Sequence, residues 1–251
     1  MKNKYLQNLN KIEFVVTSAC TGRCKHCSEG EHTLKGERID AKVASESVRK
    51  IASEYDIKTV MTFGGEPLLH TDAVYAIMKA AKEMNVPKRQ VITNGYFSKD
   101  EERIKEVAKE LSKCEVNDLL LSVDVFHQEF IPLDVVRKFA IELKRLDVPI
   151  KLQPAWLKSE SDGNDYNGRT KEILDSFSDL EIPVSEGNIV FPEGNALKYL
   201  SEYFKDNIPE NPYEEDPCDV KCVSFSANGD VLCGNVYKTD VMEIISSYEP
   251  K

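Results

Sequence analysis

The middle of the chain alternates short apolar or β-branched runs with amphipathic stretches of helical periodicity. This alternation is typical of βα units around a parallel sheet, because each helix returns the chain to start a neighbouring strand in the same direction. The expected strands cover residues 13–16, 59–63, 90–93, 118–123, 150–153 and 182–191. The pattern predicts an α/β fold whose strand and helix repeats form an incomplete barrel, open on one side.

Four of the expected helices have clear apolar faces, over residues 40–55, 71–84, 99–113 and 133–146. Asp40 suits the position before the first helix, because its short carboxylate can accept hydrogen bonds from the free N–H groups of a helix start. In parallel α/β architectures the site is built from loops at the carboxyl ends of the strands. The functional residues are therefore expected just after the strands.

The charge balance argues against nucleic acid as a partner. Lys and Arg total 33 against 43 Asp and Glu, which gives a net charge of -10, and no basic block interleaves with aromatic residues. No apolar run approaches the ~20 residues of a spanning helix, and the N-terminus lacks the apolar core of a signal peptide. We expect a cytoplasmic protein with no membrane or nucleic-acid partner.

The chain has seven cysteines. In a reducing compartment they indicate metal ligands or free thiols rather than disulfides. Six of them form two groups, Cys20, Cys24 and Cys27 near the N-terminus and Cys218, Cys222 and Cys233 near the C-terminus. The seventh, Cys114, is expected to be a buried apolar residue at the end of a helix.

The first cysteine group has the spacing C-x3-C-x2-C and directly follows the first expected strand. Three closely spaced thiolates can hold three irons of a cubane cluster and leave the fourth iron open to another ligand. From these residues alone, a zinc site that takes His26 or His32 as a fourth ligand is the alternative.

Other polar motifs follow the next three strands. They are the run Gly64-Gly65-Glu66-Pro67, then Asn94, and then Ser122, Asp124 and His127. The cysteine spacing together with the Gly-Gly-Glu-Pro run resembles the radical S-adenosylmethionine (radical SAM) superfamily, with a motif order that covers about residues 12–192. The resemblance implies a TIM-like partial (β/α)6 barrel and a [4Fe-4S] cluster held by Cys20, Cys24 and Cys27.

The resemblance also implies that SAM binds the open iron through its methionine amine and carboxylate. Reductive cleavage of SAM would then release a 5′-deoxyadenosyl radical that abstracts hydrogen from a substrate. An oxygen-sensitive enzyme of this kind needs a low-potential electron donor such as flavodoxin or ferredoxin.

Several residues correspond to the SAM-binding positions of the family: His26, Gly64, Gly65, Glu66, Asn94, Ser122 and Asp124. Glycines let the main chain come close to a ligand, and the Glu66 carboxylate can accept hydrogen bonds from the methionine ammonium. Asn94 has an alternative role as a turn former in Asn-Gly. His127 is the candidate catalytic residue, for proton relay or substrate positioning, with helix capping as its alternative.

The C-terminal cysteines flank a glycine turn that predicts a hairpin between residues 223–226 and 231–233. The segment resembles the start of a SPASM or shorter twitch extension, which implies one auxiliary [4Fe-4S] cluster on Cys218, Cys222 and Cys233. Its fourth ligand is open or a residue such as Asp219 or Asp240, and zinc or no metal are the alternatives.

A Pro-rich acidic connector places the domain boundary near residue 208. We predict a partial barrel over 1–208 and a small extension over 209–251. SPASM and twitch relatives often modify peptides, but the cluster loop begins at Cys20, which leaves no room before it for a peptide-recognition domain. A peptide or a small metabolite both stay open as substrate. The rival hypothesis is a non-catalytic scaffold that binds zinc or an iron–sulfur cluster.

Overall fold

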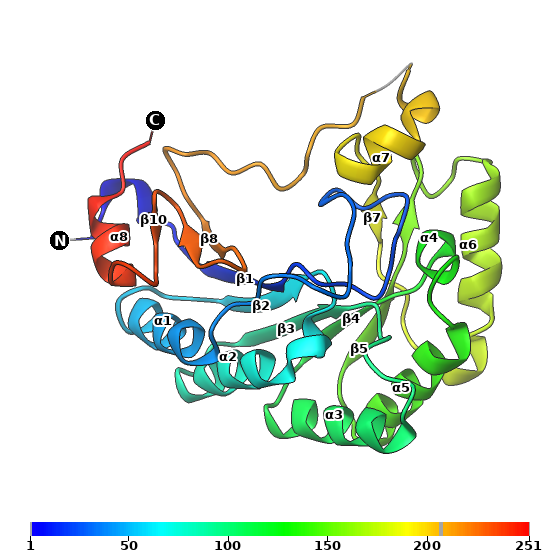
Figure 1. Cartoon of the computed structure of the whole chain (residues 1–251), viewed down its shortest axis with the longest axis horizontal. Coiled ribbons are helices and arrows are strands. Elements are labelled where there is room, and N and C mark those ends of the chain that lie inside the picture. Colours follow the sequence, from blue (N-terminus) through cyan, green and yellow to red (C-terminus); the bar gives the residue numbers. More distant parts are fainter. Residues whose placement is uncertain (1, 206–207, 251) are drawn as a thin grey trace.

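The computed structural model describes residues 2–205 and 208–250. Its main sheet has six strands in the order β5-β4-β3-β2-β1-β8, and every neighbouring pair is parallel (Figure 1). The strands are β1 (Lys11–Thr17), β2 (Thr59–Gly64), β3 (Lys88–Thr93), β4 (Asp118–Ser122), β5 (Ile150–Gln153) and β8 (Cys222–Phe225). The expected α/β fold with an open, barrel-like parallel sheet is confirmed.

Four helices cover one face of this sheet in Figure 1. They are α1 (Ala41–Glu54), α2 (Thr71–Glu83), α3 (Glu101–Lys113) and α5 (Leu133–Arg145), close to the predicted ranges. Asp40 caps α1, since its side chain accepts a hydrogen bond of 2.9 Å from the N–H of Val43. Buried apolar residues such as Val48, Ile77 and Val107 form the faces that pack on the sheet.

The strand expected over 182–191 forms only in part. A two-residue strand, β7 (Asn188–Ile189), pairs with β6 (Ala155–Trp156) in a small separate parallel sheet. The interruption has a local cause: Pro154 separates β6 from β5, and Pro183 has no N–H to donate to a ladder. The sixth strand of the main sheet therefore comes from elsewhere in the chain.

That strand is β8, from the C-terminal segment, which lies beside β1 in parallel register. Lys11 is opposite Cys222, and Phe14 is opposite Phe225. The two phenylalanine rings are fully buried and stack with their centroids 4.6 Å apart. The C-terminal segment thus contributes both backbone hydrogen bonds and core to the main sheet.

The expected C-terminal hairpin is shifted along the chain. Its antiparallel pair is β9 (Asp230–Val231) with β10 (Gly234–Asn235), because β8 uses its ladder with β1 instead. The predicted domain division at 208 stays a prediction, and residues 206–207 beside it lie outside the described residues.

The remaining elements are short. They are α4 (Val125–Gln128), α6 (Asp165–Asp175), α7 (Gly194–Tyr199), α8 (Val241–Ser247) and the 3-10 turns Lys4–Leu6, Pro67–His70, Ser178–Leu180 and Ser201–Phe204. Within 2–205 and 208–250, none of the helices combines the length and apolar character that crossing a bilayer requires.

Candidate cluster and SAM site

The cysteine loop connects β1 to α1, and its two limbs hold each other by backbone hydrogen bonds. The N–H of Cys20 donates to the carbonyl of Thr33 at 2.9 Å. At the tip, a Cβ on Gly22 would lie 3.1 Å from the Cys24 sulfur and 3.7 Å from the Cys20 sulfur. Two thiols therefore gather around a position that only glycine fits well.

The three thiols of this loop are withdrawn from water. Burial raises the pKa of Cys20 to about 12, and burial also raises the pKa of Cys24 and of Cys27. For Cys24, negative charge on the other two sulfurs would add to this effect. Metal binding replaces such thiol protons. Three desolvated sulfurs on one loop fit the donor set of a site-differentiated [4Fe-4S] cluster.

Cys27 has a partner in His32. The Cys27 sulfur lies 3.3 Å from Nε2 of His32, and Nδ1 of the same ring lies 2.8 Å from the carbonyl of Ser18. Because a carbonyl only accepts, Nδ1 carries the proton, and Nε2 accepts from the Cys27 thiol. His32 thus orients this sulfur.

The Gly-Gly-Glu-Pro run packs against the start of the cysteine loop. The N–H of Gly65 donates to the carbonyl of Thr17, and the N–H of Glu66 donates to the carbonyl of Ala19, both at 2.8 Å. A Cβ on Gly65 would stand 2.1 Å from the Ala19 oxygen, and Gly64 has a φ of +123°. Both glycines allow the loop before Cys20 to approach this closely.

The Glu66 side chain is fully buried and holds the end of β3. One carboxylate oxygen accepts from the hydroxyl of Thr93 at 2.7 Å and from the N–H of Leu68 at 2.9 Å. The other oxygen accepts from the N–H of Asn94 at 2.8 Å. Burial raises the pKa of Glu66 to about 7, against these hydrogen bonds.

Asn94 lies between Glu66 and the cysteine loop. Its side-chain oxygen accepts from the N–H of Tyr96 at 2.8 Å, which forms the expected turn. Its side-chain nitrogen lies 3.6 Å from the Cys20 sulfur and 3.2 Å from the Thr21 hydroxyl. Asn94 therefore contacts a predicted cluster ligand directly.

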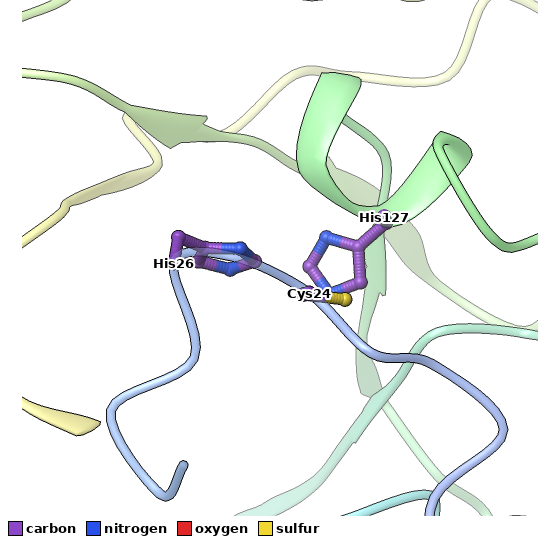
Figure 2. Close-up of side chains that lie close together, drawn as sticks. All are labelled: Cys24, His26 and His127. Carbon is purple, nitrogen blue, oxygen red and sulfur yellow. The ribbon is translucent and has the colours of Figure 1, made fainter. Parts of the chain in front are cut away.

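A second set of predicted residues meets on the other side of Cys24. Figure 2 shows the His127 ring pointing toward the Cys24 sulfur, with the His26 ring beside it. One ligand atom from each of the three residues lies within 4.8 Å of the others. The His26 ring is 4.8 Å from that of His127 and 4.9 Å from that of Phe126, by centroid.

Asp124 is fully buried and orients His127. Its oxygens lie 2.9 Å and 2.8 Å from Nδ1 of His127, and it accepts the His127 N–H at the start of α4. Burial alone would raise the pKa of Asp124. The charge and the hydrogen bonds of His127 act in the opposite direction, and the pKa of Asp124 falls below its usual range. Burial lowers the pKa of His26 to about 4, and its Nδ1 has no protein partner.

The start of α7 also holds the cysteine loop, which the sequence analysis did not predict. The side chain of Asn195 is buried and donates to the carbonyl of Cys24 at 3.0 Å, and its N–H donates to the carbonyl of Cys27 at 2.9 Å. The preceding Gly194 allows this approach, since a Cβ there would stand 2.3 Å from the Ser28 oxygen. The feature of the sequence that could have indicated this contact is the Gly194-Asn195 pair.

Ser122, the remaining predicted residue, lies buried at the end of β4 opposite Gln153 of β5. The C-terminal cysteines lie apart from this site. Cys222 pairs with Lys11 at the amino end of β1, whereas Cys20 follows the carboxyl end, and β1 from Lys11 to Thr17 spans roughly 20 Å at the rise of an extended strand. Cys218 and Cys233 are exposed.

In the described part of the chain, the sulfurs of these three cysteines do not all lie within 4.8 Å of one another, and neither do those of Cys20, Cys24 and Cys27. The burial of Cys114, in contrast, agrees with its expected role as an apolar residue after α3.

A parallel α/β sheet that carries a three-cysteine loop at its carboxyl edge defines a class of cluster-binding enzymes. The sequence profile of the Radical SAM superfamily matches residues 14–205, and the chain belongs to this superfamily.

Named relatives fall in one group. The chain is 30% identical over 207 residues to a probable GTP 3′,8-cyclase of Sulfolobus acidocaldarius, covering 76% of this chain and 62% of that protein. It is 25% identical over 207 residues to a GTP 3′,8-cyclase of Clostridium botulinum, covering 77% of this chain and 63% of that protein. The chain thus spans less than two thirds of these relatives' length.

Solved structures share the fold. Streptococcus suis SuiB bound to precursor peptide SuiA matches with a TM-score of 0.61 at 16% identity, over 96% of this chain and 65% of SuiB. Native anSMEcpe with bound AdoMet matches with a TM-score of 0.60 at 14% identity, over 96% of this chain and 81% of that chain. A [4Fe-4S] cluster and SAM are the cofactors that family membership implies.

Proposed function

We propose that the chain cleaves SAM reductively and uses the product to abstract hydrogen from a substrate. The observation that carries the proposal is that Cys20, Cys24 and Cys27 share one loop at the carboxyl edge of the sheet, and that the Gly-Gly-Glu-Pro run packs against the start of this loop by two backbone hydrogen bonds. When bound, a [4Fe-4S] cluster supplies the electron that splits SAM into methionine and a 5′-deoxyadenosyl radical.

Residues of the chain would bind the cluster and the methionine end of SAM. Cys20, Cys24 and Cys27 would be the cluster ligands. The glycines of the Gly-Gly-Glu-Pro run would present backbone groups to the methionine end of SAM. Glu66 has a free lone pair for the ammonium besides its three protein donors, since a carboxylate can accept about four hydrogen bonds.

We expect SAM to bind next to Cys24, where the rings of His26 and Phe126 pack together. His26, packed on Phe126, would contact the adenine, and its unpartnered Nδ1 is available to a ligand. Ser122 and Asn94 would border the pocket from the ends of β4 and β3. Asp124 is engaged by His127, which favours a role in orienting that imidazole over a direct contact with ribose. His127 would then face the substrate.

A small metabolite is the substrate class that we favour over a peptide. The two named relatives are called GTP 3′,8-cyclases, whereas the peptide-bound SuiB supports only the fold. An electron donor of low potential, such as flavodoxin or ferredoxin, would reduce the cluster, and a reducing compartment such as the cytoplasm would keep the thiols free.

Anaerobic reconstitution tests this function. With SAM and dithionite, the wild type should bind about four or eight irons and release 5′-deoxyadenosine. Cys24→Ala should abolish both the N-terminal cluster and SAM cleavage, because two thiolates do not hold a site-differentiated cubane. Cys114→Ala is the matched control and should keep both. A colourless protein with stoichiometric zinc would instead support the scaffold hypothesis.

We also propose one auxiliary [4Fe-4S] cluster on Cys218, Cys222 and Cys233. Its support is the grouping of three cysteines within one short segment of the sequence. Cys222→Ala should reduce the iron content by about half while some SAM cleavage continues. An unchanged iron count would rule out this cluster.

A further inference from the structure

The side-chain amide of Asn94 has a fixed orientation. Its oxygen must face Tyr96, because the N–H of Tyr96 donates to it at 2.8 Å. The amide nitrogen therefore points the other way, toward the Cys20 sulfur at 3.6 Å and the Thr21 hydroxyl at 3.2 Å. An N–H group at this distance from sulfur is a hydrogen-bond donor to it.

The backbone of Asn94 is held as firmly as its side chain. Its N–H donates to the buried carboxylate of Glu66 at 2.8 Å, and the neighbouring Thr93 hydroxyl donates to the same group at 2.7 Å. A chain of contacts thus runs from the Gly-Gly-Glu-Pro run through Asn94 to a cysteine of the cluster loop.

The turn alone does not require an asparagine. Aspartate or serine could equally accept from the N–H of Tyr96, since this contact needs only an oxygen. The amide nitrogen is the group that distinguishes Asn94 from these residues, and it is directed at Cys20.

We infer that Asn94 is a positioning residue that donates an N–H···S hydrogen bond to Cys20 and raises the reduction potential of the cluster. The inference rests on the proposed function, because Cys20 must ligate iron. A donor to a cluster sulfur favours the reduced state, which carries one more negative charge. Glu66 acts through Asn94 by fixing where this donor lies.

The test is a redox titration of the reconstituted protein, followed by the electron paramagnetic resonance signal of the reduced cluster. Asn94→Ser keeps an oxygen for the turn but cannot reach Cys20. It should bind wild-type amounts of iron yet show a more negative midpoint potential. A tenfold decrease in the equilibrium constant for reduction corresponds to a midpoint potential about 59 mV more negative for a one-electron couple.

Thr21→Val is the matched variant, because it removes the competing acceptor. It also removes the 3.4 Å contact of the Thr21 hydroxyl with the Asn94 oxygen, but the N–H of Tyr96 still fixes the amide at 2.8 Å. Its midpoint potential should equal that of the wild type or be less negative. Electron–nuclear double resonance in deuterated buffer should also detect an exchangeable proton near the cluster in the wild type and in Thr21→Val, and lose it in Asn94→Ser.

Equal potentials and equal proton couplings in the wild type and Asn94→Ser would overturn the inference, as would a more negative potential in Thr21→Val. These outcomes leave the proposed function intact, since iron binding and 5′-deoxyadenosine release are measured separately. If the wild type itself bound no iron and released no 5′-deoxyadenosine, the proposed function would fail first.

Discussion

A single methyl group at Gly65 tests how closely the two signature motifs must pack. In Gly65→Ala the new Cβ would stand 2.1 Å from the carbonyl oxygen of Ala19, and backbone atoms have nowhere to move without breaking the adjacent hydrogen bonds. Overpacking of this kind costs about 3 kcal/mol. We expect a large drop in the midpoint of thermal unfolding and loss of iron binding.

Gly168→Ala in α6 is the control for this substitution, since a Cβ there meets nothing within 4 Å. It should leave iron binding unchanged and stabilise the helix by about 0.5–1 kcal/mol. Equal unfolding midpoints for the two variants would contradict the close packing described at Gly65.

The buried carboxyl of Glu66 makes stability depend on pH. Burial raises the pKa of Glu66 to about 7 from its usual 4.5, so the folded state holds a proton that the unfolded chain releases. This contribution is complete below about pH 4.5 and is lost as the pH rises through about 7. Glu66→Gln lacks this titration.

Urea unfolding of the metal-free protein across this range measures the effect. The wild type should lose about 3 kcal/mol relative to Glu66→Gln between about pH 4 and pH 8, at 1.36 kcal/mol for each unit of pKa shift. Parallel pH profiles for the two proteins would exclude a raised pKa at this position.

At the scale of elements, α7 supports the cysteine loop from a distant part of the sequence. Asn195→Ala removes one of the two donors to the carbonyl of Cys24, which keeps the N–H of Cys27 at 3.2 Å, and loss of such a hydrogen bond costs about 1 kcal/mol. We expect iron to be lost to a chelator faster than from the wild type. Leu197→Ala, an exposed position on the same helix, should lose iron at the wild-type rate.

Local patterns predicted most of the elements but not this support. The periodicity of residues 99–113 and the cap at Asp40 act within one helix, so the sequence displays them directly. The contact of Asn195 with Cys24 joins residues 171 positions apart. The same limit applies to Glu66, because two of its three donors, Thr93 and Asn94, become neighbours only when β2 and β3 pair. Sequence reasoning placed Glu66 at the site but could not show which protein groups it contacts there, and it did not place Asn195 there.

At the scale of the whole molecule, the C-terminal segment completes the sheet. The motif pattern alone suggested a separate extension, since the cysteines of 209–251 form their own group. β8 nevertheless pairs with β1 over four positions and buries Phe225 against Phe14. Because β1 leads directly into the cysteine loop, we expect the sheet edge and the site to depend on the C-terminal segment.

A chain truncated after residue 208 tests this dependence. Removing β8 exposes the edge of β1 and the buried Phe14, and an uncovered apolar edge promotes aggregation. We expect this protein to be insoluble or to unfold without a cooperative transition, and to bind no iron. Phe225→Ala, which keeps the strand, should cost about 3–5 kcal/mol and retain the cluster loop.

Truncation after Tyr248 is the matched control, because it leaves β8 and α8 in place. This protein should unfold cooperatively, as the full chain does, and bind iron at the N-terminal cysteines. A soluble and cooperatively folded chain of residues 1–208 with a wild-type N-terminal cluster would show that the barrel is autonomous. The β1–β8 ladder would then be a docking contact between two domains, and the division predicted at residue 208 would hold for folding as well as for motif order.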